Sequence, residues 1–259
     1  MQSSEKVPVD TLVAQCDGHM VPITKSFSYF TAMPVEEVDL RRWLFDPIAA
    51  VPPKVGEVLP HLRFVLVPYL ESPVVRSARK SSAKSKPAAS GPRGEMVTFQ
   101  RPAAKRQLLA HYLSEADETF LFLAVKNQDL ADYHYVFYNG LASLITQGLT
   151  AKQRERFDAL VREELVNETH GEVDEASWRL KEEVLQRAVD PTRNSKALQN
   201  YLSQALVDTL TLYLHGLCCD IDIEAGPRQL ASRPLRQRLL LLREILPPPK
   251  GIPLFPEEL

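Results

Sequence analysis

Cysteine and glycine are scarce in this chain, and each scarcity excludes a class of structure. Only three cysteines occur among 259 residues, and two of them, Cys218 and Cys219, are adjacent. An odd number with this spacing argues against a disulfide framework, so we expect reduced thiols and a cytoplasmic setting. Glycine occurs ten times and proline twenty times, a balance that predicts extended connections in place of tight glycine turns.

Motifs that identify several enzyme classes are also missing. The sequence has no G-x-x-x-x-G-K-[ST] and no G-x-G-x-x-G, so a glycine-rich loop that cradles phosphate is not predicted. It has no G-x-S-x-G elbow of the kind that serine hydrolases use. No heptad pattern predicts a long coiled coil, and no internal repeat is present. Whether the protein is an enzyme therefore stays open at this point.

Neither sign of charge predominates. The net charge of −2 gives no overall attraction to nucleic acid or to acidic membranes, so a nucleic-acid partner is not favoured. The first fifteen residues lack an apolar core and a basic leader, and we expect no secretory signal. Polar residues interrupt the longest apolar stretch at Gln204, Asp208 and His215, so we also expect no membrane span.

Strand patterns occupy the first half of the chain. SFSYFTAM (26–33) alternates between large and small side chains, which is typical of a strand. LRFVLVPYL (62–70) is almost continuously apolar, which predicts a strand buried on both faces, with an edge or bulge at Pro68. Further strands are predicted over 95–100 and 119–125.

Helical spacing dominates the second half. Apolar residues recur three and four positions apart, and capping signals such as Thr150 with Gln153 mark helix starts. We expect the first 19 residues to be loose at their start, and prolines from Pro47 onward to stop regular structure. Helices are predicted over 36–44, 105–113, 127–148, 150–168, 174–188, from Tyr201 to about Gly216, and over 232–246.

These patterns predict the α+β class, with a small N-terminal β-sheet followed by and packed against a predominantly α-helical C-terminal half. We expect one α+β domain over 1–259, because the apolar strands need a cover that the helices can supply. Within it, the strand-containing part spans 20–125, the helical part spans 127–246, and an extended proline-rich tail spans 247–259.

The segment that begins at Tyr201 ends in the densest group of candidate metal ligands. His215 lies three positions before Cys218 and four before Cys219, so either pair points the same way from a helix. Imidazole and thiolate together suit zinc, and a third ligand is available from Asp222, His134 or His170.

The opposing interpretation of that segment needs no metal. The chain lacks the C-x-x-C and H-x-x-x-H elements usual in zinc sites. Cys218 and Cys219 would then be small buried residues, and His215 a core histidine hydrogen-bonded near Asp208 or Asp222. Our prediction assigns no cofactor and keeps zinc as the alternative.

A second candidate site is THGEVDEASW, residues 169–178. His170, Glu172 and Glu175 lie close together there, and carboxylates beside a histidine can perform acid–base chemistry or hold a metal. The simpler explanation is that a helix begins at this point, since helix N-termini favour acidic residues.

The order of these segments resembles minimal zincin metallopeptidases. That resemblance implies a helix with H-E-x-x-H and a later glutamate as the third zinc ligand. The matching stretch is His134-Tyr135-Val136-Phe137-Tyr138, in which Tyr135 replaces the general base and Tyr138 replaces the second histidine. Only His134, with Glu172 or Glu175, carries over from the family pattern. The resemblance covers residues 60–180 at most, and it implies a degenerate scaffold instead of a peptidase.

Two segments are candidates for contact with a protein partner. RSARKSSAKSKPAASGPR (76–93) has six basic residues, no acidic residue and no large apolar side chain, so we predict a disordered basic insertion. It either touches an acidic partner or is only a solvated insertion, since no aromatic residue interleaves its charges as nucleic-acid stacking requires. The proline-rich tail 247–259 can reach a partner in the same way.

Three functions are consistent with these patterns. The first is a binding, regulatory or scaffold protein, which the missing enzyme motifs and the two partner segments favour. The second is a metal-dependent hydrolase, zinc being the candidate ion, that uses His134, His215 and nearby acidic or thiol groups. The third is an oligomerising structural subunit.

Overall fold

The computed structural model describes residues 6–16, 18–73, 94–115, 117–219 and 228–255. The chain folds into two compact units, each made from two segments of sequence. The sheet unit comprises Met1–Asp39 and His61–Asp129, and the helical unit comprises Leu40–Pro60 and Leu130–Leu259. The α+β class predicted from the sequence is confirmed, with two β-sheets in the N-terminal half and helices α5–α9 in the C-terminal half.

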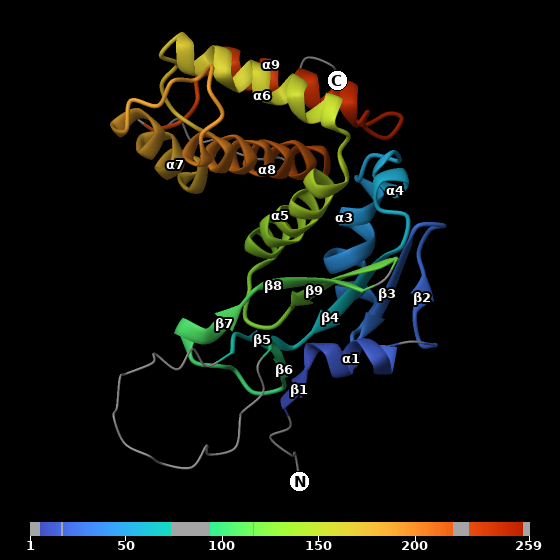
Figure 1. The fold of residues 1–259 in the computed structure, drawn as a ribbon. Helices are drawn as coiled ribbons and strands as arrows, with labels where there is room; N and C mark the ends of the chain where they lie inside the picture. Colours follow the sequence, from blue (N-terminus) through green and yellow to red (C-terminus); the bar gives the residue numbers. More distant parts are fainter. Residues whose placement is uncertain (1–5, 17, 74–93, 116, 220–227, 256–259) are drawn as a thin grey trace, which may run out of the picture. The chain divides into compact units, whose positions relative to one another are not determined.

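Two sheets form the sheet unit (Figure 1). The larger has the order β2-β3-β4-β9-β8, in which β3, β4 and β9 run parallel and the edge strands β2 and β8 run antiparallel. The smaller sheet, of order β1-β6-β5-β7, is antiparallel throughout. The strand bounds are β1 Lys6–Pro8, β2 Val21–Pro22, β3 Phe27–Thr31, β4 Leu62–Val67, β5 Tyr69–Glu71, β6 Met96–Thr98, β7 Gln107–Leu108, β8 Ala110–Glu115 and β9 Glu118–Ala124.

The parallel strands are buried on both faces, as their continuous apolar runs predict. Alternate residues of β4 and β9, among them Val65 and Phe122, pack against helix α1 (Val9–Cys16), which supplies Leu12 and Cys16 to the same core. The intervening side chains, such as Phe64, are equally buried. The prediction of strands at 26–33, 62–70, 95–100 and 119–125 is therefore confirmed, with Pro68 dividing the second into β4 and β5.

One prediction in this unit is wrong. The helix expected over 105–113 is instead a short 3₁₀ turn (Ala104–Arg106) followed by β7 and β8, because β8 pairs along its whole length with β9. A cross-strand ladder of this kind overrides weak helical spacing. The start of the chain that we expect to be loose includes residues 1–5, which lie outside the described residues. The following helix α1 is not predicted, although its buried residues recur at the three-and-four spacing of an amphipathic helix.

Short helical turns come before the five longer helices of the helical unit. The bounds are α2 Glu37–Leu40, a π-helical turn Arg41–Phe45, α3 Asp46–Ala49, α4 Val55–Val58, α5 Leu130–Gly148, α6 Ala151–Val166, α7 Glu175–Gln186, α8 Lys196–Cys218 and α9 Ser232–Ile245. Pro47 does not stop regular structure as predicted. It occupies the first turn of α3, where its missing N–H is not needed.

The predicted helix starts are mostly confirmed by their caps. Thr150 and Gln153 form the expected capping box of α6, and Asp174 caps α7. Helix α8 begins at Lys196 under the side-chain cap of Ser195, five residues before the predicted start at Tyr201. The N-cap of α9 is Ala231, and Ser232 is the first helical residue, as the predicted range 232–246 has it.

Helix α8 is the centre of the helical unit, as its broad apolar surface predicts. It contacts α5, α6, α7 and α9, and Figure 1 shows α7 lying along it. Tyr213, fully buried in α8, donates a 2.6 Å hydrogen bond to the carbonyl of Leu246 after α9. The ring centroid of Phe255 lies 4.0 Å from the guanidinium carbon of Arg236, which returns the described part of the tail to α9.

A buried charge cluster of Arg238, Glu164, Glu172 and Lys181 joins α6, α7 and α9. Arg238 has no exposed side-chain surface and donates to both carboxylates, at 3.0 Å to Glu164 and 2.9 Å to Glu172. Lys181 donates to the carbonyls of Thr169 (2.7 Å) and Gly171 (2.8 Å) and lies 3.7 Å from Glu172. The two positive and two negative charges balance, which is the condition for burying so many ions.

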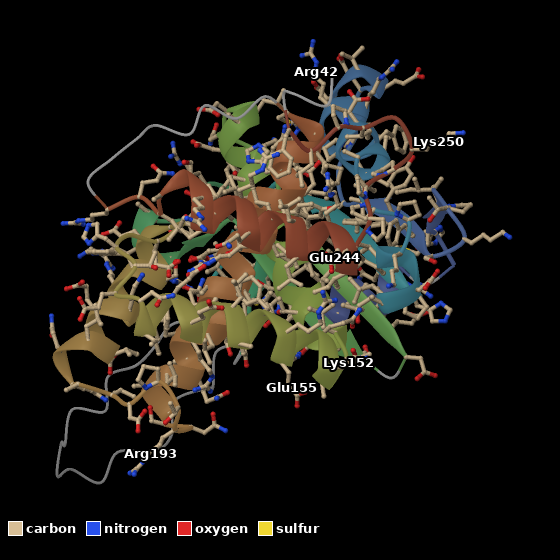
Figure 2. All side chains as sticks on the ribbon, turned by 90° about the horizontal axis from the view of Figure 1, so that it is seen from above. Arg42, Lys152, Glu155, Arg193, Glu244 and Lys250 are labelled. Atoms are coloured by element: carbon tan, nitrogen blue, oxygen red, sulfur yellow. The ribbon has the colours of Figure 1, made fainter. Side chains whose placement is uncertain are left out.

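Charged residues cover the outside of the helical unit. Lys152 and Glu155 of α6, Glu244 of α9 and Arg193 after α7 all project away from the helices (Figure 2). In the part of the chain that the structure describes, no helix is both long enough and apolar enough to cross a membrane.

Candidate metal centre

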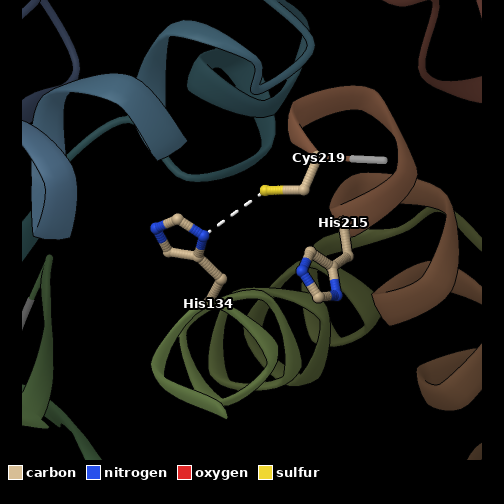
Figure 3. A group of neighbouring side chains, drawn as sticks. All are labelled: His134, His215 and Cys219. Carbon is tan, nitrogen blue, oxygen red and sulfur yellow. Dashed lines mark hydrogen bonds between the residues drawn. The ribbon is translucent and has the colours of Figure 1, made fainter. Parts of the chain in front are cut away.

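The helical unit brings together two imidazoles and one thiol from segments far apart in the sequence. His134 lies near the start of α5, His215 in the last turn of α8, and Cys219 directly after α8 (Figure 3). One ligand atom from each residue lies within 4.8 Å of the other two. The four-residue spacing of His215 and Cys219 gives two of the ligands from one helix end, and the contact of α5 with α8 supplies the third.

Two contacts orient the ring of His134. Its Nε2 lies 2.9 Å from the carbonyl oxygen of Arg42, and its Nδ1 lies 3.3 Å from Sγ of Cys219. A carbonyl can only accept, so Nε2 carries the proton and Nδ1 presents its lone pair to the thiol. A backbone carbonyl on the distal nitrogen is the usual outer partner of a metal-bound histidine.

His215 is held by its neighbours and kept uncharged by its surroundings. The ring of Tyr138 lies beside it, with centroids 5.5 Å apart at 30°. Burial lowers the pKa of His215, and the nearby His134 lowers it further. The imidazole is therefore neutral at neutral pH, which is the form that binds a metal.

The position of the group in α8 also favours a cation. His215 and Cys219 lie at the carboxyl end of a 23-residue helix, where the helix dipole is negative. His134 is 8% exposed, whereas His215 and Cys219 are partly exposed, so an ion can reach the site from solvent.

Cys218 is not part of this group. Among the described residues the group comprises His134, His215 and Cys219 alone, and the thiol of Cys218 instead neighbours the hydroxyl of Tyr138, whose pKa is raised by burial first and by this thiol second. The same hydroxyl donates a 3.0 Å bond to the carbonyl of Pro47. Asp222, the remaining candidate from this segment, lies outside the described residues.

The structure does not bring His170, Glu172 and Glu175 to this site. Glu172 accepts from the hydroxyl of Tyr201, which stands 14 positions before His215 on α8. At about 1.5 Å of rise per residue this places Tyr201 and His215 roughly 21 Å apart along the helix. His170 packs edge-to-face on Trp178 with centroids 5.2 Å apart, and the exposed Glu175 pairs with Arg179.

The donor set of His134, His215 and Cys219 fits zinc. Bonds of about 2.0–2.3 Å in a tetrahedron require ligand atoms to lie about 3.3–3.6 Å apart. Nδ1 of His134 and Sγ of Cys219 already have this separation, at 3.3 Å. Because the ligand atoms of the group lie up to 4.8 Å apart, zinc binding would require the side chains to move by about 1 Å. Three protein ligands leave a fourth position for water or another ligand.

Two features of this unit lay beyond the sequence patterns. The carbonyl of Arg42 that orients His134 has no side-chain signature. Arg238 lies three positions after Leu235 and four before Leu242, so helical spacing places it on the buried face of α9. Its partners Glu164 and Glu172 are 74 and 66 positions away, and no local pattern predicts them. By sequence, Glu164 is an ordinary residue of a predicted helix, and Glu172 is a candidate metal ligand of the 169–178 segment, so neither indicates a buried ion pair.

Comparisons with protein-family models, with curated protein sequences and with solved structures each gave no match.

Proposed function

We propose that this protein binds zinc through His134, His215 and Cys219, and that it serves as a binding, regulatory or scaffold protein whose helical unit is stabilised by the ion. The observation that carries the proposal is the convergence of three ligand atoms within 4.8 Å, one of them on a histidine whose tautomer is set by the Arg42 carbonyl. Zinc bound there would connect α5 to the end of α8.

A thiol–imidazole pair can also act without metal, as a nucleophile and its base. The contact between Cys219 and His134 has that geometry at 3.3 Å. However, Cys219 follows the carboxyl end of α8, whose negative dipole disfavours a free thiolate and favours a bound cation. A nucleophile–base pair of Cys219 and His134 would not need the second imidazole, His215, whereas a metal site would use it as a ligand.

A metal-dependent hydrolase is the second candidate function. It is favoured by the three-ligand set, which leaves a coordination position where zinc activates water. It is disfavoured by Tyr135, which stands where the zincin pattern has its general base. The hydroxyl of Tyr135 donates instead to Asp174 at 2.6 Å. The carboxylates of Glu172 and Glu175 are engaged with Arg238 and Arg179. A binding role is therefore the better supported of the two.

The partner segments belong to the same proposal. We propose that the basic segment 76–93 contacts an acidic protein partner; it lies outside the described residues. In the tail 247–259, Phe255 is held between Arg236 and Arg243, so the described part of this segment is engaged with α9.

The test is the zinc content of the purified full-length chain, measured by elemental mass spectrometry after dialysis. We expect about one equivalent in the wild type and a loss of most of it in His134→Ala, His215→Ala and Cys219→Ser. Cys218→Ser is the matched control, because the thiol of Cys218 is not among the three ligand atoms, so this variant should retain the metal. Substoichiometric zinc in the wild type, or equal loss from the two cysteine variants, would contradict the proposal.

A further inference from the structure

A second concave site lies between the end of α6 and one face of α7. This cavity, of about 270 Å³, is called here the Trp178 pocket. Leu165 and Glu168 line it from α6 and the residues just after it, and Trp178, Glu182 and Leu185 line it from α7. The last three recur at the four-and-three spacing that places side chains on one helix face.

Several contacts fix the position of the connection between α6 and α7, which forms one wall of the pocket. Gly171 has φ +86°, and a Cβ at this position would meet the carbonyl oxygen of Gln229 at 2.2 Å. Lys181, whose Nζ donates to the carbonyls of Thr169 and Gly171, fixes the same connection to α7. Backbone bonds at 2.9 and 3.0 Å join Glu172 to the chain before α9. The wall is therefore ordered before any ligand arrives.

The pocket carries two uncompensated negative charges. Glu168 and Glu182 pair with no cation among the residues that the structure describes. Lys181 lines the floor at 2% exposure, but two carbonyls and Glu172 already occupy its ammonium group. Since the buried charge cluster is neutral as a whole, the net charge that a ligand meets is that of the two glutamates.

Glu168 occupies a position that is unfavourable in two ways. Its φ of 52° is left-handed, where helix ends usually place glycine. Its carboxylate also follows the carboxyl end of α6, where the helix dipole favours cations. Ala188 has the same backbone conformation after α7, so the conformation alone does not single out Glu168. What distinguishes Glu168 from Ala188 is its carboxylate, which lines the pocket.

The lining defines the chemistry of a ligand. The ring of His170 also lines the pocket and packs edge-to-face with Trp178, with centroids 5.2 Å apart. An indole is the best side chain for binding a cation, and the carboxylates of Glu168 and Glu182 add charge attraction. Leu165 supplies an apolar wall, which suits an aliphatic stem. At about 270 Å³ the cavity is smaller than the roughly 300–1,000 Å³ typical of whole cofactors or drug-sized ligands, so it suits one side chain.

We propose that the Trp178 pocket binds the cationic side chain of a lysine or arginine presented by a partner protein. A partner is favoured over a free amine because Leu185, at the same pocket, is 53% exposed. That apolar surface is covered only if the peptide on either side of the cation lies over it. The site is separate from the zinc ligands and does not depend on them.

Tryptophan fluorescence of the full chain tests the proposal. The chain has two tryptophans, so the titration is done in a Trp43→Phe background, in which Trp178 is the only indole. The probes are two capped pentapeptides, one with a central lysine and one with norleucine, its uncharged isostere. We expect saturable quenching by the lysine peptide and at least tenfold weaker binding of the norleucine peptide.

Charge-neutral variants separate the pocket from general surface attraction. Glu168→Gln combined with Glu182→Gln should weaken lysine-peptide binding about tenfold, since two partly exposed ion pairs are lost. Glu155→Gln, which removes an exposed carboxylate elsewhere on α6, should leave binding unchanged (Figure 2). Circular dichroism verifies that each variant is folded.

Three results would overturn the proposal. The first is equal affinity for the lysine and norleucine peptides. The second is equal weakening by Glu155→Gln and by the double variant. The third is equal affinity for free butylamine and for the lysine peptide, which would refute a protein partner.

Discussion

Removing Arg238 should destabilise the helical unit strongly, and the effect should depend on pH. In Arg238→Met, the carboxylates of Glu164 and Glu172 lose a guanidinium that now donates to both, while remaining buried at 5% and 0% side-chain exposure. Breaking a buried ion pair by removing one partner costs about 3–5 kcal/mol. Because the whole stability of a domain is about 5–15 kcal/mol, this substitution removes a large share of it.

The pH dependence follows from Glu172. Burial alone would raise its pKa, but the hydrogen bonds and charge of Arg238 outweigh burial and hold the pKa below its ordinary value. In the wild type this carboxylate therefore contributes stability above its unfolded pKa and loses it as pH falls through the lower folded pKa. Without Arg238, burial is opposed only by the hydrogen bond from Tyr201 and the charge of Lys181, so the folded pKa of Glu172 rises relative to the wild type. The variant then gains relative stability as pH falls.

Urea unfolding followed by circular dichroism at neutral pH and at about pH 5 measures both effects. We expect the difference in free energy of unfolding between wild type and Arg238→Met to be about 3–5 kcal/mol at neutral pH and smaller in acid. The double variant Arg238→Met with Glu172→Gln should recover part of the loss, since fewer buried charges remain unpaired. A difference below about 1 kcal/mol, or one independent of pH, would refute this account of the cluster.

Three further predictions follow. Gly171→Ala should lower the free energy of unfolding by at least about 2 kcal/mol, because residue 171 has a positive φ and the new Cβ would lie 2.2 Å from a carbonyl oxygen. Gly18 also has a positive φ (+83°) but open space around it, so Gly18→Ala should cost only about 1 kcal/mol in the same urea titration. Thr150→Ala breaks the capping box of α6 and should cost about 1 kcal/mol, whereas loss of a few tenths or less would contradict the cap. Zinc affinity, measured by chelator competition, should fall with decreasing pH as protons compete for the thiolate and imidazoles, and an affinity independent of pH would exclude these ligands.

The sequence predicted the elements whose periodicity is strong and whose neighbours do not alter it. The apolar runs that became β4 and β9 and the amphipathic patterns of α5 to α9 are of this kind. The stretch 105–113 was not predicted correctly, because its structure depends on the pairing of β8 with β9, and local spacing carries no information about that pairing. Helix α1 is not predicted, although Val9, Leu12, Val13 and Cys16 have the helical period, because the helix has only eight residues and a polar stretch precedes it.

The sequence predicts the candidate metal centre only in the part that depends on local spacing. The spacing of His215 and Cys219 placed two ligands at one helix end, and His134 was one of several third ligands. Choosing His134 over His170 required knowing that α5, and not the 169–178 segment, reaches the end of α8. No sequence pattern contains that packing, nor the carbonyl of Arg42 that sets the tautomer of His134.

The most direct test of the central claim is the absorption spectrum of the cobalt-substituted protein. Cobalt(II) occupies zinc sites, and a thiolate ligand adds a ligand-to-metal charge-transfer band in the near ultraviolet. We predict this band in the wild type and in Cys218→Ser at one equivalent of cobalt, and its loss in Cys219→Ser. A wild-type spectrum without the band, or a band that survives Cys219→Ser and disappears in Cys218→Ser, would contradict a metal centre of His134, His215 and Cys219.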